Sequence, residues 1–500
     1  MIYKKYFFIF FLGSFVACRS PQARNEKSEN LSTIEGSQDL VEEPKEANTP
    51  TDTPLHETKG SLKKDPPQIK KTKKEPKGRF NFSGDEFIKE SGSNPFEKKN
   101  DTVMRIRGRA KVSTKNLRMV SPQIEIYGSD GRYAYAKGPV ELVDTKNNTR
   151  ITANEALFLR SENKAILRGD TRLQTRINKK KKDIKKELIT LTANEMERRF
   201  DTATSLARGN VIVKTEDGVL YANEVEFFET QNLVRSSSSP RIFTTTDLIL
   251  ADAIEWNITE KKTEFYKNVK GFFNRQRSDI KRKDNDSVET TARADNATLF
   301  QDENSTFKQR LILRNRIIIE RGEFKAFADE AEIFGAAADL IKAKNKIRII
   351  NHDEKSESFG DFFEWHKKSG YTSLSARPHF RTRTILYDDK GAETVEIQSA
   401  TATRATTDSQ PQARGDVRIL QREKDKATTS TSANMGGEWA EINPDEKIIR
   451  LYGRPYIEGE MGRIAARNII LYYEERRYEM LGIEPGLVEK QMNRSEGEHE

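Results

Sequence analysis

The sequence predicts an all-β fold of stacked two-strand repeats, and three observations carry this prediction. A phrase of the form Ala-[Asn/Asp]-x-apolar-x-apolar recurs along the chain. A glycine often follows sixteen positions after the alanine, as Gly169 follows Ala153 and Gly209 follows Ala193. Apolar and polar residues alternate after each phrase, which is typical of half-buried strands. Self-similarity at this spacing indicates one supersecondary unit stacked on copies of itself.

The first segment, residues 1–18, has the layout of a signal peptide. Two lysines precede an apolar run, Tyr6 to Val16, which is too short to cross a bilayer of roughly 30 Å as a helix. Cys18 is the only cysteine and resembles the lipid acceptor of a bacterial lipoprotein, so we expect lipid attachment there and a membrane anchor. An ordinary signal peptide cleaved nearby and an uncleaved anchor remain alternatives, because Phe15 stands where such lipoproteins usually carry leucine.

Residues 19–100 are predicted to be a disordered linker rich in Pro, Lys and Glu. Residues 19–79 hold 7 of the 16 prolines and no aromatic residue, a composition that buries too little apolar surface to order itself. Lysines gather near its end, which indicates either attraction to an anionic surface or a solvated spacer. A polar tail, residues 488–500, is also expected to fray.

The repeats occupy residues 101–274 and 291–487, with a charged loop at 275–290 between the two parts. Each unit is expected to be a strand, a turn and a second strand, without a helix. The repeat glycine is expected at a bend or bulge, where one sheet passes to the other. Residues 464–480 have helical propensity, but their register in the repeat predicts strand, turn, strand. The pattern blurs between 351 and 393, where no strands are placed.

The apolar face of each strand provides the candidate binding residues. These inward positions either line an apolar groove or pack against one another as an ordinary core, and the pattern does not separate the two. The candidates are Phe158, Val225, Phe227, Ile254, Trp256, Leu299, Ile333, Ile469 and Leu471.

The phrase, followed by a turn and Gly-x-Val-x-Val, resembles the OstA-like (LptA) family, which includes LptA, the jellyroll part of LptC and the N-terminal domain of LptD. The resemblance covers most of residues 101–485 and is best at stretches such as 151–173, 191–213 and 464–482. It implies an elongated V-shaped β-jellyroll whose groove holds the acyl chains of lipopolysaccharide. It also implies that the jellyroll joins other Lpt-type jellyrolls by edge-strand pairing. The chain is longer than a typical LptA, so its place in a transport chain stays open.

We therefore expect a non-enzymatic lipoprotein of the cell envelope, located in the periplasm and anchored to the inner or outer membrane. It would help to bridge lipopolysaccharide transport to the outer membrane. The alternative is a periplasmic or surface-exposed scaffold or adhesin that uses the same slab of repeats for protein interactions.

The sequence offers no chemistry that would favour an enzyme. It has no GxxxxGK[ST] phosphate loop and no GxSxG elbow, so we expect no catalytic residue and no cofactor. We also expect no metal site, because His352, His366 and His379 lie far apart in the sequence and a thiolate site would need more than one cysteine. The net charge of +9 comes partly from the linker, and no nucleic-acid-binding motif accompanies it, so no nucleic acid partner is expected.

Overall fold

A computed structural model of the protein describes residues 81–178, 186–244, 247–273, 289–301, 305–406, 408–422, 431–459 and 462–483. The signal peptide, Cys18, linker residues 19–80 and the tail 488–500 lie outside the described residues. The described residues confirm an all-β fold: they form 30 strands in one antiparallel sheet and a single short 3₁₀ turn, η1 (Glu229–Gln231). No helix in this part is long and apolar enough to cross a membrane.

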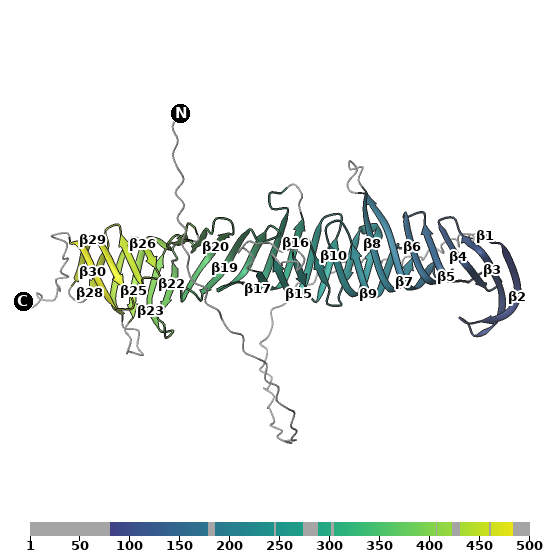
Figure 1. Ribbon diagram of the computed structural model, residues 1–500, viewed down its shortest axis with the longest axis horizontal. Helices are drawn as coiled ribbons and strands as arrows, with labels where there is room; N and C mark the ends of the chain where they lie inside the picture. The colour runs from purple at the N-terminus through teal and green to yellow at the C-terminus, as the bar shows by residue number, and fades with distance from the viewer. Residues whose placement is uncertain are drawn as a thin grey trace, which may run out of the picture. The chain divides into compact units, whose positions relative to one another are not determined.

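The strands follow one another along the sheet in the order of the sequence, and most long strands pair with the strands before and after them (Figure 1). Some rungs consist of two short strands in place of one long strand, as β11 and β12 do against β10. The strands are β1 (Asn81–Ser83), β2 (Glu86–Asn94), β3 (Lys99–Ser113), β4 (Leu117–Tyr127), β5 (Tyr133–Asp144), β6 (Thr149–Leu159), β7 (Lys164–Asn178), β8 (Lys186–Arg199), β9 (Thr204–Lys214), β10 (Val219–Phe228), β11 (Leu233–Ser236), β12 (Arg241–Phe243), β13 (Leu248–Leu250), β14 (Ala253–Asn257), β15 (Lys262–Phe273), β16 (Thr290–Gln301), β17 (Gln309–Arg321), β18 (Phe324–Phe334), β19 (Leu340–Asn351), β20 (Ser356–His366), β21 (Thr372–Ser375), β22 (Thr382–Tyr387), β23 (Glu393–Ser399), β24 (Thr401–Arg404), β25 (Gln412–Arg422), β26 (Thr431–Asn443), β27 (Ile448–Tyr452), β28 (Tyr456–Gly459), β29 (Gly462–Tyr472) and β30 (Arg477–Ile483).

The boundary of the linker, expected at residue 100, is corrected by β1 and β2. Both strands pair with β3, and Phe82 lies opposite Val112 while Phe87 lies opposite Ile106. The stretch is polar because it forms the outer edge of the sheet, where few side chains are buried. Its phenylalanines, Phe82, Phe87 and Phe96, are nevertheless a compositional signal that the linker lacks, because residues 19–79 hold no aromatic residue.

Most long strands bend at a β-bulge, as predicted for the repeat glycine. Gly169 and Asp170 have φ values of 72° and 47°, and the β6–β7 register shifts opposite them. A Cβ atom on Gly169 would lie 2.7 Å from Asn154 Nδ2, so the glycine packs against the repeated Ala-Asn phrase. The left-handed pair recurs at other bends, where glycine, asparagine or lysine takes the first place. These pairs are Gly108-Arg109, Gly209-Asn210, Lys267-Asn268, Asn315-Arg316, Asn345-Lys346 and Gly415-Asp416.

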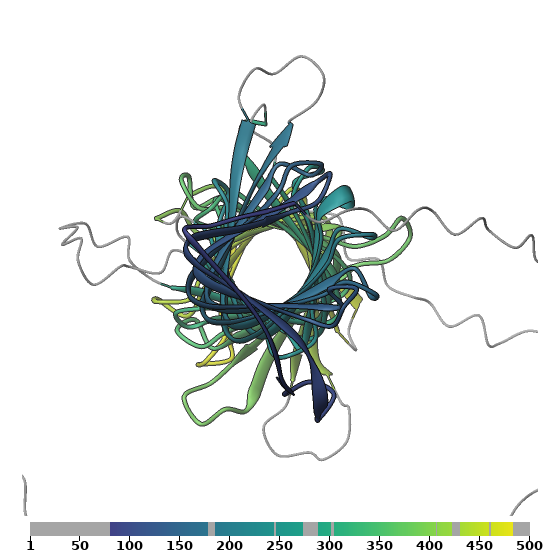
Figure 2. The same cartoon turned by 90° about the vertical axis from the view of Figure 1, so that its right-hand side faces the viewer.

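The bends fold the sheet into two walls that face one another. The rings of Phe324 on β18 and Phe363 on β20 stack with centroids 5.8 Å apart. Through their common partner β19, however, Phe363 is level with Ala331, seven residues along β18 from Phe324. Seven residues of a flat strand span roughly 23 Å. The two rings can meet only because the sheet turns back on itself at the bulge, and Figure 2 shows the strands wound around a common axis.

The core fills the space between the walls and consists of two clusters of buried apolar side chains. The larger cluster runs from Ile106 to Leu374, and the smaller one from Leu386 to Tyr473. The break between them falls between β21 and β22. Residues 274–288, which hold most of the predicted charged loop, lie outside the described part, and the flanking strands β15 and β16 pair directly.

Two further expectations concern strand placement. Residues 464–480 form most of β29, a turn and the first part of β30, so strand, turn, strand is confirmed. The blurred stretch between 351 and 393 contains β20, β21 and β22. Its pattern is hard to read because the second wall of this rung is made by a four-residue strand followed by an irregular bend.

Candidate ligand-binding site between the walls

All nine sequence-predicted binding residues point inward and are buried, with exposed fractions of 0 to 5%. Seven belong to the larger core cluster, while Ile469 and Leu471 belong to the smaller one. None of the nine lines the cavity described below. In this structure they pack as core, and the prediction that lipid chains replace those contacts stays a prediction.

The ends of the strands form two rims, and we call the gap between the rims the mouth. The first rim contains the turns 145–148, 215–218, 322–323 and 352–355 together with Asp247. The second rim contains the turns 160–163, 200–203, 229–232, 258–261, 335–339 and 367–371, together with Gln309 and Arg404.

Polar side chains bridge the mouth at several levels of the stack. Asp217 on the first rim pairs with Lys261 on the second, with 3.4 Å between Oδ1 and Nζ. Gln309 Nε2 donates to Asp247 Oδ2 over 2.6 Å, and both side chains are buried. The rims are thus tied by contacts between residues 44 and 62 positions apart.

A cavity of about 690 Å³ opens between the rims at the level of β17 to β21. Its inner part is apolar, with side chains from β17, β18, β19 and β20. Its outer part is polar and charged, so its lining is amphipathic. The apolar lining comprises Ile317, Ile319, Phe324, Ala326, Ala328, Ile341, Ala343, Phe363 and Trp365, and the charged lining comprises Arg321, Glu323, Asp339, Asp353, Lys367, Lys368 and Arg404.

Aromatic groups span this cavity from rim to rim. The Arg321 guanidinium carbon lies 4.9 Å from the centre of the Trp365 ring, and the Phe324–Phe363 stack lies beside it. Arg321 Nη1 also donates to Thr290 Oγ1 over 3.1 Å. The four basic side chains of the lining outnumber its three carboxylates. The geometry therefore suits a ligand with an apolar body and a polar, anionic end.

A second cavity of about 160 Å³ adjoins the first and shares Phe324 and Phe363 with it. Leu374 and Leu386, which belong to the two different core clusters, both line it. Arg404 borders both cavities and pairs with Glu354 across the mouth, with 2.6 Å between Nη2 and Oε1. The second cavity therefore lies at the break in the core, and the first lies beside it within the larger cluster.

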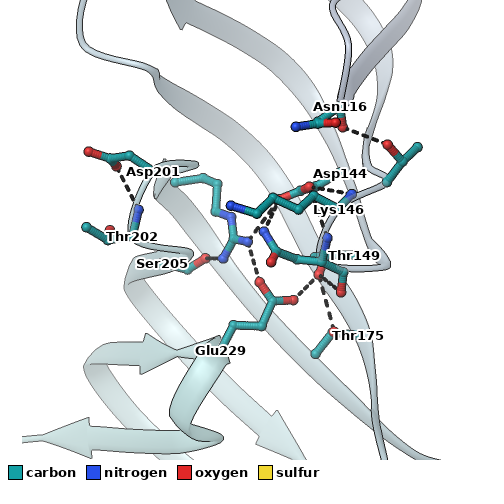
Figure 3. Close-up of polar contacts among 12 residues, drawn as sticks. Asn116, Asp144, Lys146, Thr149, Thr175, Asp201, Thr202, Ser205 and Glu229 are labelled. Carbon is teal, nitrogen blue, oxygen red and sulfur yellow. Dashed lines mark hydrogen bonds and ion pairs between the residues drawn. The ribbon is translucent and has the colours of Figure 1, made fainter.

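The mouth is closed differently at β5 to β10, where a buried ion cluster centres on Arg198. The Arg198 side chain is fully buried, and its Nη2 lies 3.3 Å from Asp144 Oδ2 and also pairs with Glu229. Arg198 Nη1 donates to Ser205 Oγ over 3.2 Å. Thr149 donates to Glu229, so the first rim contributes Asp144 and Thr149 to the cluster. Figure 3 shows Asp144, Ser205 and Glu229 converging from separate strand ends.

The electrostatics of the cluster are set by burial. Burial raises the pKa of the Glu229 carboxyl above its ordinary value, while Arg198 and a hydrogen bond from Thr175 act in the opposite direction. Asp144 also accepts from the backbone N–H groups of Lys146 and Asn147, which fixes the β5–β6 turn. Arg198 Nε has no hydrogen-bond partner among the described residues. The cluster thus ties two rims together without satisfying every donor.

Arg198 was missed as a site residue, although the sequence carried a signal. In the repeat that begins at Ala193, the inward positions are Met196 and Arg198, whereas the corresponding pair after Ala222 is Val225 and Phe227. A charged residue at an inward position of the repeat is the departure that would have identified it. The cavity residues carried no such signal, because their assembly depends on which rungs face one another.

No group of three or more His, Cys, Asp or Glu side chains in the described part is arranged to hold a metal ion. Comparisons with protein-family models and with curated protein sequences find no match for the chain.

Proposed function

We propose that the protein is a non-enzymatic lipoprotein of the cell envelope that binds the acyl chains of lipopolysaccharide between its two walls. The observation that carries the proposal is the amphipathic cavity at the mouth. Its apolar inner part offers acyl chains a water-excluding surface, and burying each methylene there gains about 0.8 kcal/mol. Lys367 and Lys368 at its outer part lie where the phosphates of the headgroup would emerge.

The V-shaped jellyroll of the OstA-like family fits this proposal. Two facing walls joined by bulged bends and a mouth between strand ends are the features such a groove needs. Head-to-tail joining to other jellyrolls is proposed for the two edges. Phe82 and Phe87 at one edge and Tyr478 and Leu481 at the other are 43 to 51% exposed, although each is a large apolar side chain. Unpaired strands with exposed apolar groups favour pairing with a further strand.

The experiment places a photoreactive amino acid at Phe324, which lines both cavities, in the full-length chain. A matched variant carries it at Tyr266, which is 40% exposed on the outside of the sheet. We expect ultraviolet light to crosslink purified lipopolysaccharide at position 324 and not at position 266. Deacylated lipopolysaccharide should not compete. No crosslink at position 324, or equal crosslinking at both positions, would contradict lipid binding between the walls.

The edges are tested separately, with the photoreactive residue at Phe87 on β2 and at Leu481 on β30. Strand pairing predicts a covalent product between two protein chains from either position. A protein that crosslinks lipid at position 324 but forms no chain-to-chain product would retain the binding proposal and lose the bridging one.

A further inference from the structure

The Arg198 cluster lies directly on the track that acyl chains would follow. The second apolar position of each repeat phrase forms a row along the mouth side of the interior. From the cavity toward the N-terminus this row consists of Ile333, Leu299, Trp256, Phe227, Arg198 and Phe158. Arg198 is the only charged member of this row.

Polar side chains meet Arg198 from both rims. Its neighbours in the sheet are Ala165 on β7 and Ser205 on β9, and Arg198 Nη1 donates to the Ser205 hydroxyl. Asp144 and Thr149 approach from the first rim and Glu229 from the second. Charged and hydroxyl groups from both rims therefore fill a level that is apolar on either side of it.

The other bridges differ in where their side chains sit. Gln309 begins β17, two positions before Leu311, which faces Leu299 and Ile333 of the row. Asp247 and Asp217 project from turns on the first rim. Those bridges cover the row from the mouth side, whereas the Arg198 bridge interrupts it.

We infer that Arg198 with Asp144 and Glu229 ends the acyl-binding track. Chains that enter at the cavity reach as far as Phe227 and do not pass to Phe158. The inference rests on the proposed function and restricts lipid to the rungs from Phe227 to the cavity, so the edge at β1 and β2 can pair with another chain but passes no lipid. A chain that passed this level would have to separate buried charges from their partners and then lie against them, which is strongly unfavourable.

The same cluster is a poor anchor for the anionic headgroup. The guanidinium of Arg198 already faces two carboxylates, Asp144 and Glu229. A phosphate would have to displace one of them from a site that is closed to water. The cluster therefore limits how far acyl chains extend, and the lysines of the cavity contact the headgroup.

The experiment compares photoreactive residues at Phe227 and Phe158, on either side of Arg198, with purified lipopolysaccharide as the probe. Position 324 is measured first in the same preparation, because absence of labelling there overturns the proposed function and the inference with it. With labelling at 324, the inference expects labelling at 227 and at least tenfold less at 158. Equal labelling at 158 and 227 overturns the boundary alone, as does absence of labelling at 227.

A neutral variant then tests whether the charges cause the boundary. Asp144→Asn, Arg198→Met and Glu229→Gln together remove the charges and keep the acceptors for the β5–β6 turn and for Thr149. We expect labelling to appear at position 158 in this variant. The matched control, Lys261→Met with Asp217→Asn, neutralises another bridge, which lies outside the cavity lining, and should leave position 158 unlabelled. Circular dichroism verifies that both variants are folded, and the comparison of positions 227 and 158 in the unaltered chain decides the boundary without them.

Discussion

Two levels of the mouth, built from the same repeat, are bridged in different ways. At β5 to β10 a buried ion cluster fills the gap between the rims, and at β17 to β21 aromatic contacts bridge the rims around a cavity of about 690 Å³. Both levels contain an arginine that reaches toward the other rim. Arg198 is fully buried against two carboxylates, whereas Arg321 lies over the Trp365 ring at the edge of the cavity. The backbone pattern thus sets where the walls lie, and a few side chains set whether the space between the rims is filled or left as a cavity.

The largest effect on stability should come from removing the cation of the Arg198 cluster while its two carboxylates stay in place. Arg198→Ala leaves Asp144 and Glu229 buried without their cation, so we expect the free energy of unfolding to fall by about 3–5 kcal/mol. The neutral triple variant described above should be close to the unaltered protein. Denaturant unfolding followed by circular dichroism measures both. Equal losses in the two variants would mean that packing, and not charge, makes this level stable.

Replacing a buried phenylalanine by alanine should lower the free energy of unfolding more at the level of β5 to β10 than at the cavity. Phe227→Ala removes a fully buried ring and should cost about 3–5 kcal/mol. Phe363 borders the cavity on one side, so Phe363→Ala should cost about 1–2 kcal/mol less, since fewer contacts are lost. The same unfolding measurement applies. A larger loss for Phe363 would contradict the cavity.

The Arg404–Glu354 bridge provides a weaker counterpart to the Arg198 cluster. The Arg404 and Glu354 side chains are 27% and 21% exposed, so water screens the pair. Glu354→Gln should therefore lower the free energy of unfolding by about 1 kcal/mol or less. A loss as large as that of Arg198→Ala would show that burial does not explain the difference between the two bridges.

The smallest effect is a pH dependence that belongs to the closed level. Because the pKa of Glu229 is raised in the folded protein, the folded state holds this proton more tightly than the unfolded state. Its contribution to stability is therefore full below pH 4.5 and decreases as pH rises through the folded pKa. Glu229→Gln removes this term, so its stability relative to the unaltered protein should improve from pH 4.5 upward. A difference that stays constant from pH 4 to pH 7 would contradict the raised pKa.

The sequence predicted the parts of the fold that repeat. Alternation gave the strands, and the repeat glycine gave the bulges, because left-handed φ values favour glycine there. The same alternation predicted that Phe158 and Trp256 point inward, which their burial confirms. These features depend on neighbours within about 20 residues, which a single sequence displays.

The parts that do not repeat could not be predicted in the same way. The cavity depends on Phe324 and Phe363 meeting across two walls, and the closed level depends on Thr149 reaching Glu229, 80 residues away. Neither contact produces a recurring residue spacing that could be recognised in the sequence. Strands β1 and β2 were missed although Phe82 and Phe87 distinguish them from the linker, because the rest of this outer edge is polar and lacks the repeated phrase.

Pairing between chain neighbours also determines the order in which this protein can assemble. Each rung needs only the strand just made and the one before it, so the chain loop closed at each step is short, as in a helical bundle. During synthesis the first rungs can form before later ones exist. The ties across the mouth come later, because Arg198 must wait for Glu229 and Asp247 for Gln309. Until each tie forms, the growing stack has an open mouth, and its apolar interior is exposed to whatever amphiphile is nearby.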